Sequence, residues 1–160
     1  MSERTEHEQV INPSPGLARG HILLVGEPEN GSATAYRALL ERAGYVVSGA
    51  PYDQAMSAPR VVGADVVILL NIDAGPSGLG IVRDLRTQAD TRATPLIALT
   101  RCDDAYTREQ IVRAGATAIL IDPVKPPLLL RQLRRLLARL LVAAGSPASR
   151  AAKLTVTPAV

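Results

Sequence analysis

The sequence predicts an α/β fold, a doubly wound three-layer sandwich built around a sheet of five parallel strands. Short apolar runs alternate along the chain with longer segments whose apolar residues recur at helical spacing. The runs of the first, third, fourth and fifth expected strands, such as Val66-Val67-Ile68-Leu69-Leu70, are apolar on both faces, so these strands are expected to be buried in a parallel sheet. Right-handed crossovers between such strands place helices on both faces of the sheet.

The chain divides into five strand–helix units with a tail on either side. The expected strands cover residues 22–25, 45–47, 66–70, 95–100 and 117–121, and the expected helices cover about 32–43, 53–60, 77–88, 104–114 and 127–142. Residues 1–19 are expected to form a flexible leader and residues 144–160 a flexible tail, because both are rich in polar residues, Pro, Gly or Ser. One domain over residues 20–143 lies between them.

In the first two units, spacing and end signals define the helices. The helix over 32–43 has one apolar face made by Ala35, Leu39, Leu40 and Ala43. Gly44 is expected to close it, since glycine readily adopts the left-handed conformation found after helix ends. The strand 45–47 follows, and Asp53 is expected to cap the next, shorter helix.

The last three units follow the same pattern. In the helix over 77–88, the residues expected to face the sheet are Leu79, Val82 and Leu85. The strand 95–100 precedes a helix that Gly115 is expected to end. The strand 117–121 leads to the longest helix, which is amphipathic. We expect the functional groups to lie at the carboxyl ends of the strands, as in other open α/β sheets.

Composition excludes several classes of protein. Of the 160 residues 47% are apolar, but there is no Trp or Phe, so aliphatic residues and Ala must build the core. No apolar stretch approaches the ~20 residues needed to cross a bilayer. The single cysteine, Cys102, excludes an internal disulfide and a multi-cysteine zinc site. A net charge of +3 with few aromatic residues does not favour nucleic-acid binding. We expect a cytoplasmic protein with no membrane partner.

Short pieces of sequence occur in a characteristic order across residues 21–142. They are Ile22-Leu23-Leu24-Val25, Leu39-Leu40-Glu41-Arg42-Ala43-Gly44-Tyr45, Ala64-Asp65-Val66-Val67-Ile68-Leu69-Leu70-Asn71, Ser77-Gly78-Leu79, Pro95-Leu96-Ile97-Ala98-Leu99-Thr100, Ala114-Gly115-Ala116, Leu120-Ile121-Asp122-Pro123-Val124 and Leu133-Arg134-Arg135-Leu136-Leu137. In order and spacing the chain resembles the receiver domain of bacterial response regulators, the CheY-like module of two-component signalling. This resemblance implies a flavodoxin-like (βα)5 fold.

The resemblance also implies a phosphorylation site with five parts. Two acidic residues after the first strand hold Mg²⁺, and an aspartate after the third strand accepts the phosphoryl group. A Thr or Ser after the fourth strand and a Lys after the fifth contact the phosphoryl oxygens, so that metal and side chains together neutralise and hold the charged group. In this chain only Thr100 matches cleanly. The aspartate position holds Asn71, the Lys position holds Asp122, and Glu27 is the one aligned carboxylate of the acidic pair.

Two further positions depart from the family pattern. The residue after Thr100 is usually small and is here Arg101, and the aromatic residue of the fifth strand is replaced by Ile119. We therefore interpret Asn71, Glu27, Thr100, Asp122 and Arg101 as a vestigial phosphorylation site, with no catalytic residue, no enzyme activity, no resident metal, and Mg²⁺ binding that is lost or weak.

Charge predicts how the vestigial site is filled. An unpaired Asp122 beside Glu27 would be costly, since like charges raise each other's pKa. We expect Arg101 to fold in, to occupy the space of metal and phosphate, and to pair with Asp122 or Glu27. Asn71 is expected to donate its amide hydrogens to one of those carboxylates. The alternative is that Arg101 is a solvated loop residue.

The predicted function is that of a stand-alone atypical receiver domain, a phosphorylation-independent protein–protein interaction module. Its partner would be a histidine kinase, another regulator or a second copy of itself in a homodimer. The predicted interaction face comprises Ile119, Arg131, Arg134, Arg135 and Arg139, although the arginines are also consistent with a solvated helix face.

Two other functions stay open. Asp73 lies two residues after Asn71 and could serve as the phosphoacceptor of an active, Mg²⁺-dependent receiver. Alternatively, the arginine-rich last helix could bind an anion or a nucleotide, because guanidinium groups suit bidentate phosphate contacts.

Overall fold

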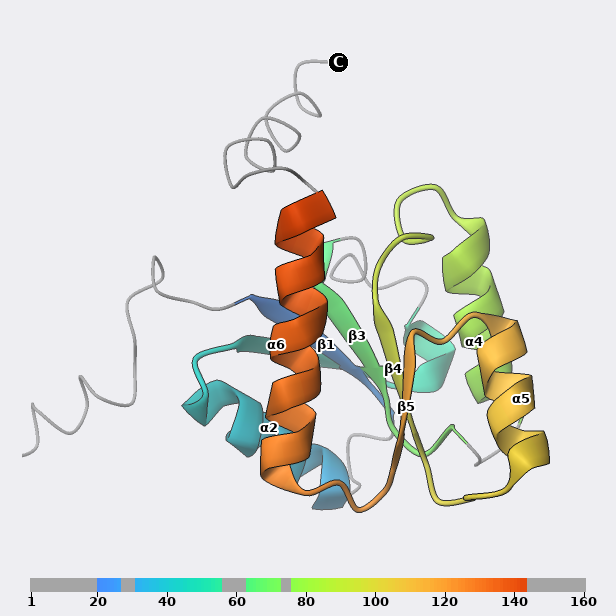
Figure 1. Cartoon of the computed structure of the whole chain (residues 1–160), viewed down its shortest axis with the longest axis horizontal. Coiled ribbons are helices and arrows are strands. Elements are labelled where there is room, and N and C mark those ends of the chain that lie inside the picture. The colour runs from blue at the N-terminus through green and yellow to red at the C-terminus, as the bar shows by residue number, and fades with distance from the viewer. Residues whose placement is uncertain (1–19, 27–30, 56–62, 73–75, 144–160) are drawn as a thin grey trace, which may run out of the picture.

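A computed structural model describes residues 20–26, 31–55, 63–72 and 76–143 of the chain (Figure 1). Its strands form a five-stranded parallel sheet in the order β2-β1-β3-β4-β5. The strands are β1 (His21–Val25), β2 (Val46–Ala50), β3 (Val66–Leu69), β4 (Leu96–Thr100) and β5 (Ala118–Ile121). The helices are α2 (Gly31–Arg42), the 3-10 helix η2 (Tyr52–Gln54), α4 (Pro76–Thr87), α5 (Ala105–Ala114) and α6 (Pro126–Ala143). The predicted leader and tail lie outside the described residues, so the division into domain and tails stays a prediction.

The helices cover both faces of the sheet, which confirms the predicted doubly wound sandwich. Helices α2 and α6 lie on one face, and α4 and α5 lie on the other (Figure 1). Two separate apolar clusters fill the spaces between the layers. Successive strand residues point to opposite faces, so Leu23 packs in the cluster under α4 and α5 while Leu24 packs in the cluster under α2 and α6. No helix of the described residues is long and apolar enough to cross a membrane.

The burial of the strands follows their place in the sheet. All residues of β3 and β4 are buried, and so are all residues of β1 except His21. The prediction that the fifth strand is equally buried is wrong, because β5 lies at an edge of the sheet and only Leu120 is buried. An edge strand lacks a neighbour on one side, which leaves its side chains partly exposed.

The second unit departs most from the prediction. Strand β2 continues to Ala50, well past the predicted end at residue 47, because it pairs with β1 from His21↔Val46 to Val25↔Ala50. This pairing overrides the low strand propensity of Gly49. The predicted capping by Asp53 is also wrong, since Asp53 lies inside η2, whose preceding residue Pro51 makes no side-chain cap. The rest of the predicted helix 53–60 lies outside the described residues from residue 56 onward.

The buried face of α2 is also shifted from the predicted one. Leu40 is buried, and Leu39 and Ala43 are half-buried, but Ala35 is exposed. Tyr36 takes the central place instead, with a side chain that is 7% exposed and packs in the same cluster as Leu40. The pair stands at a spacing of four residues, which places both side chains on one helix face.

Helix α5 is capped at its start by Asp104 and ends at the glycine expected from sequence. Asp104 precedes the helix and accepts a hydrogen bond from the Thr107 amide at 2.8 Å. Gly115 follows it with a φ of 119°, a left-handed conformation that glycine adopts without a steric penalty. The predicted closure at Gly115 is therefore confirmed. The Asp104 cap fixes the end of the loop that joins β4 to α5.

Candidate functional site

The candidate site lies at the carboxyl edge of the sheet, where β3, β4 and β5 end. Thr100 is the last residue of β4 and pairs with Ile121 of β5. Arg101 and Asp122 directly follow these two residues, so the register places them side by side. Asn71 follows β3, which pairs with β4 in parallel. The structure therefore brings together Asn71, Thr100, Arg101 and Asp122, while Glu27 and Asp73 lie outside the described residues.

Asp122 forms an ion pair with Arg101. The Nε atom of Arg101 lies 3.6 Å from Oδ2 of Asp122, which confirms the predicted pairing. The side chain of Arg101 is 64% exposed, whereas that of Asp122 is 11% exposed. At this exposure water and salt screen the attraction, so the pair contributes little to stability. Arg101 therefore pairs with Asp122 while most of its side chain stays in solvent, as expected for a solvated loop residue.

The second partner of Asp122 is Tyr36, which was not identified from the sequence. The Tyr36 hydroxyl donates a hydrogen bond to Oδ1 of Asp122 and accepts one from the Val124 amide at 3.1 Å. Burial, followed by the hydrogen bond to Asp122, raises the pKa of Tyr36 to about 12. The bond connects α2 to the loop after β5, across the cis peptide between Asp122 and Pro123. Both carboxylate oxygens of Asp122 thus have partners.

A signal in the sequence could have identified Tyr36. The chain contains only four Tyr and neither Phe nor Trp, so each tyrosine is a rare large side chain. Tyr36 stands four residues before Leu40, on the face that covers the sheet. A buried tyrosine needs a polar partner for its hydroxyl, and the carboxyl edge of the sheet offers one in Asp122.

Thr100 holds the start of the loop that leads to α5. It is fully buried, and its Oγ1 accepts a hydrogen bond from the Cys102 amide at 3.0 Å and donates one to the Cys102 carbonyl at 3.3 Å. Buried hydroxyl groups require such partners. The residue that best matches the family pattern is therefore engaged with its own loop in this structure.

Asn71 occupies a left-handed backbone conformation with a φ of 51°. Asparagine tolerates this conformation better than most residues with a side chain. The carbonyl of the preceding residue, Leu70, accepts a hydrogen bond of 2.5 Å from the Tyr52 hydroxyl, which fixes the end of the segment. Within the described residues no hydrogen bond joins the Asn71 amide to Asp122, whose oxygens are held by Tyr36 and Arg101. The other expected acceptor, Glu27, lies outside the described residues, so the expected bond from Asn71 to one of the two carboxylates stays a prediction.

The structure describes only part of the edge at which the resemblance implies a Mg²⁺ ion, because Glu27 and Asp73 lie outside the described residues. Magnesium prefers oxygen ligands, usually carboxylates, in octahedral geometry. Among the residues that the structure describes, no group of three or more His, Cys, Asp or Glu is arranged to hold a metal. Asp122, the carboxylate on this edge, is held by Tyr36 and Arg101. The described part of the edge therefore does not supply a set of ligands for Mg²⁺.

The predicted interaction face lies on β5 and α6, and the structure brings only part of it together. A shallow groove of about 280 Å³ is lined by Thr117, Ala118, Ile119, Gln132, Arg135, Leu136 and Arg139. Arg131 and Arg134 are exposed on α6 but do not line the groove. The side of α6 that faces the sheet is buried at Leu129, Leu133 and Leu136, and Leu136 also reaches the groove. The predicted amphipathic character of this helix is confirmed.

Comparison with solved structures identifies the neighbours of this fold. No family model and no curated protein matches the sequence. The receiver domain of a sensor histidine kinase from Pseudomonas aeruginosa superposes with a TM-score of 0.66 and 28% identity, covering 74% of this chain and 98% of that one. The signal receiver domain of a histidine kinase from Syntrophus aciditrophicus gives a TM-score of 0.66 and 26% identity over 74% and 90% of the two chains.

A third neighbour is a chemotaxis response regulator of Vibrio cholerae, with a TM-score of 0.63 and 26% identity over 73% of this chain and 98% of that one. The structural neighbours are thus receiver domains of two-component signal transduction. The five parallel strands in the order β2-β1-β3-β4-β5, with helices on both faces, match the CheY-like flavodoxin fold that these neighbours share.

Proposed function

We propose that this protein is an atypical receiver domain of two-component signal transduction that binds a protein partner without being phosphorylated itself. One observation supports this proposal most directly. Asp122 stands where the receiver resemblance implies a phosphate-binding Lys, and it is tied to Tyr36 and Arg101. The position that would accept the phosphoryl group holds Asn71, whose neutral amide is not a nucleophile for phosphoryl transfer.

The charge of Asp122 acts against a phosphoryl group at this edge. Phosphoryl transfer depends on cations that neutralise the negative oxygens of the transferred group. A carboxylate at the Lys position instead repels those oxygens. Arg101 is adjacent, but its charge is opposed by Asp122 in the same pair. The proposal therefore includes neither an enzymatic activity nor a Mg²⁺ cofactor.

We place the partner-binding surface on the groove between β5 and α6. Arg135 and Arg139 contribute positive charge to the groove, and Ile119 and Leu136 contribute apolar surface. Arginine is enriched at protein interfaces because it combines charge, hydrogen bonding and planar packing. The partner we expect is a histidine kinase or another regulator that presents acidic residues to this groove, and a second copy of the chain is the alternative.

Intact-protein mass spectrometry tests the absence of phosphorylation. The full chain is incubated with acetyl phosphate and Mg²⁺, beside the P. aeruginosa receiver domain, whose structure contains a coordinated magnesium ion. We expect the neighbour to gain a phosphoryl group and this protein to remain unmodified. A phosphorylated product that disappears in the Asp73→Asn variant would establish the rival function, an active receiver that uses Asp73.

Charge reversal tests the binding surface. The double variant Arg135→Glu/Arg139→Glu is compared with Arg42→Glu/Arg83→Glu, which reverses two exposed charges on α2 and α4. Affinity capture detects other proteins that bind the chain, and analytical sedimentation detects its self-association. We expect one defined protein to bind the wild type and the control pair but not the groove variant. Equal capture by all three proteins would place the interface elsewhere.

A further inference from the structure

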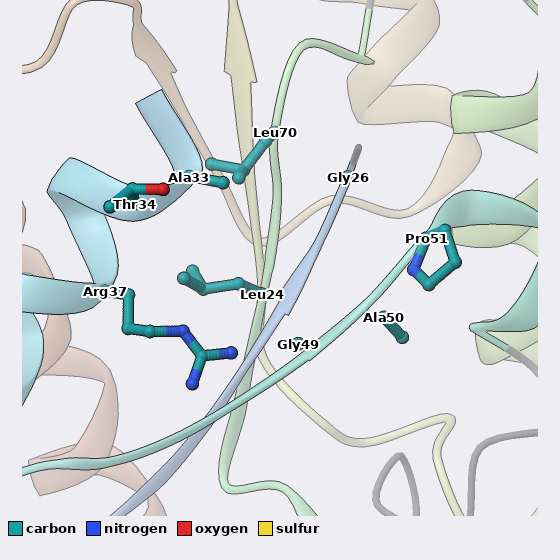
Figure 2. A pocket seen from close by; sticks show the side chains of 9 residues that line it. All are labelled: Leu24, Gly26, Ala33, Thr34, Arg37, Gly49, Ala50, Pro51 and Leu70. Carbon is teal, nitrogen blue, oxygen red and sulfur yellow. The ribbon is translucent and has the colours of Figure 1, made fainter. Parts of the chain in front are cut away.

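A second concave site lies between α2 and the carboxyl ends of β1 and β2 (Figure 2). The cavity has a volume of about 190 Å³. Six of the residues that line it matter for the argument, namely Leu24, Ala33, Thr34, Arg37, Gly49 and Leu70. The site is separate from the β5–α6 groove, because it lies at the opposite edge of the sheet.

Among the lining residues that the structure describes, Arg37 is the only one with a charged side chain. Its Nη1 donates a long hydrogen bond of 3.5 Å to the Val47 carbonyl, and no ion pair within the described residues involves it. A Cβ atom built on Gly49 would lie 2.8 Å from Nη2 of Arg37. Glycine at this position therefore lets the guanidinium group lie against the strand backbone, beside the cavity (Figure 2).

The rest of the lining favours a ligand with an apolar body and a negative head group. Leu24 and Leu70 are 4% and 3% exposed and supply apolar surface. Thr34 supplies a hydroxyl from the first turns of α2. The first turn of α2 contains no acidic residue, so its side chains do not offset the partial positive charge of the helix start. A cation would find no opposite charge among these lining residues, whereas an anion finds Arg37.

We propose that this cavity binds a small organic anion, with its carboxylate or phosphate on Arg37 and Thr34 and its apolar body on Leu24 and Leu70. The volume lies below the 300–1,000 Å³ or so of sites for drug-sized ligands, so the ligand is small. The site goes beyond the proposed partner-binding function and does not depend on it. Leu70 immediately precedes Asn71, so a bound anion would contact the segment that leads to the vestigial site.

Two-dimensional ¹H–¹⁵N NMR of the full chain tests the proposal with butyrate, benzoate and inorganic phosphate as probes. We expect at least one probe to cause saturable shifts at the amides of Leu24, Thr34, Gly49 and Leu70. Benzamide, the neutral analogue of benzoate, is expected to cause none. Shifts caused by butyrate or benzoate but not by inorganic phosphate would identify the head group as a carboxylate. Shifts caused by inorganic phosphate alone would identify it as a phosphate.

Substitution of Arg37 provides the matched comparison. Arg37→Gln is expected to lower the affinity for the probe about tenfold or more, since the substitution removes a charge-assisted contact. Arg42→Gln removes the same charge from the exposed last turn of α2 and should leave binding unchanged. Thr34→Val provides a second test if Arg37→Gln alters the helix. The proposal is overturned if no probe saturates, if Arg37→Gln and Thr34→Val bind as the wild type does, or if the shifts instead gather around Arg135 and Arg139.

Discussion

The hydroxyl of Tyr36 donates a hydrogen bond to the carboxylate of Asp122, 86 residues further along the chain. The same hydroxyl accepts a hydrogen bond from the Val124 amide. Helix α2 is thereby tied to the end of β5 at the position where the receiver resemblance implies a phosphate-binding Lys. The bond gives Asp122 a fixed partner at the edge of the sheet.

Removal of the Tyr36 hydroxyl should destabilise the fold. Tyr36→Phe preserves the ring but leaves the Val124 amide and one oxygen of Asp122 without this partner. Unpaired buried polar groups of this kind cost roughly 1–3 kcal/mol. Urea unfolding measures the loss, and Tyr106→Phe is the control because Tyr106 is 72% exposed. Equal stability of the two variants would contradict the role assigned to Tyr36.

The same bond predicts a pH dependence in the alkaline range. Burial and the hydrogen bond to Asp122 raise the pKa of Tyr36 from its ordinary value of 10.0 to about 12. The folded state therefore holds the phenol proton more tightly, so the contribution to stability is complete below pH 10.0 and is lost as the pH rises towards about 12. Phenolate absorbance should show a late-titrating component in the wild type that is missing from Tyr36→Phe. Simultaneous titration of all tyrosines in the folded protein would refute this.

Arg101 should matter much less than Tyr36, although both contact Asp122. Its side chain is 64% exposed, and its nitrogen lies 3.6 Å from the carboxylate oxygen. Exposed ion pairs of this kind contribute about 0–1 kcal/mol. Arg101→Ala should therefore reduce the free energy of unfolding by less than Tyr36→Phe does, and added salt should shrink the difference from wild type. A loss larger than that of Tyr36→Phe would contradict the minor role assigned to Arg101.

Arg86, at the opposite end of the sheet, should contribute more to the stability of the fold than Arg101 does. Its guanidinium donates to the carbonyls of Gly115 at 2.8 Å, Thr94 at 2.6 Å and Arg92 at 2.9 Å, and to the Thr117 hydroxyl at 3.0 Å. Burial lowers the pKa of Arg86, so the group is partly removed from water. Hydrogen bonds that involve a charged group contribute about 1.5–3 kcal/mol each. Arg86→Lys, which cannot reproduce this fork, should lower the urea midpoint clearly, while exposed Arg83→Lys should not.

Most of the fold could be predicted because it depends on local patterns. Local patterns predict which side chains are buried, as in the apolar run Val66–Leu69 and in the helical spacing of Val82 and Leu85. The extension of β2 through Gly49 could not be predicted in this way, since pairing with β1 stabilises it. A single residue likewise does not reveal that Asp53 enters a 3-10 turn.

In the candidate site, the sequence predicts where residues lie better than it predicts which side chains they contact. Strand order places Asn71, Thr100 and Asp122 at one edge, and opposite charge predicts the pairing of Arg101 with Asp122. The bond from Tyr36 joins two distant segments, so it requires knowledge of how α2 packs on the sheet. In the described residues Asp122 is held by Tyr36 and Arg101 and not by Asn71, while Glu27, the other acceptor expected for Asn71, lies outside them.

The proposed function requires that this protein, whose fold is receiver-like, binds its partner without accepting a phosphoryl group. Beryllofluoride, which mimics a phosphoryl group on an aspartate, tests the claim directly when it is added with Mg²⁺ to the ¹⁵N-labelled full chain and followed by NMR. The account predicts no beryllofluoride-dependent shifts at the amides of Asn71, Thr100 and Asp122. Saturable, Mg²⁺-dependent shifts at these residues and at Asp73, abolished by Asp73→Asn, would contradict it and establish an active receiver.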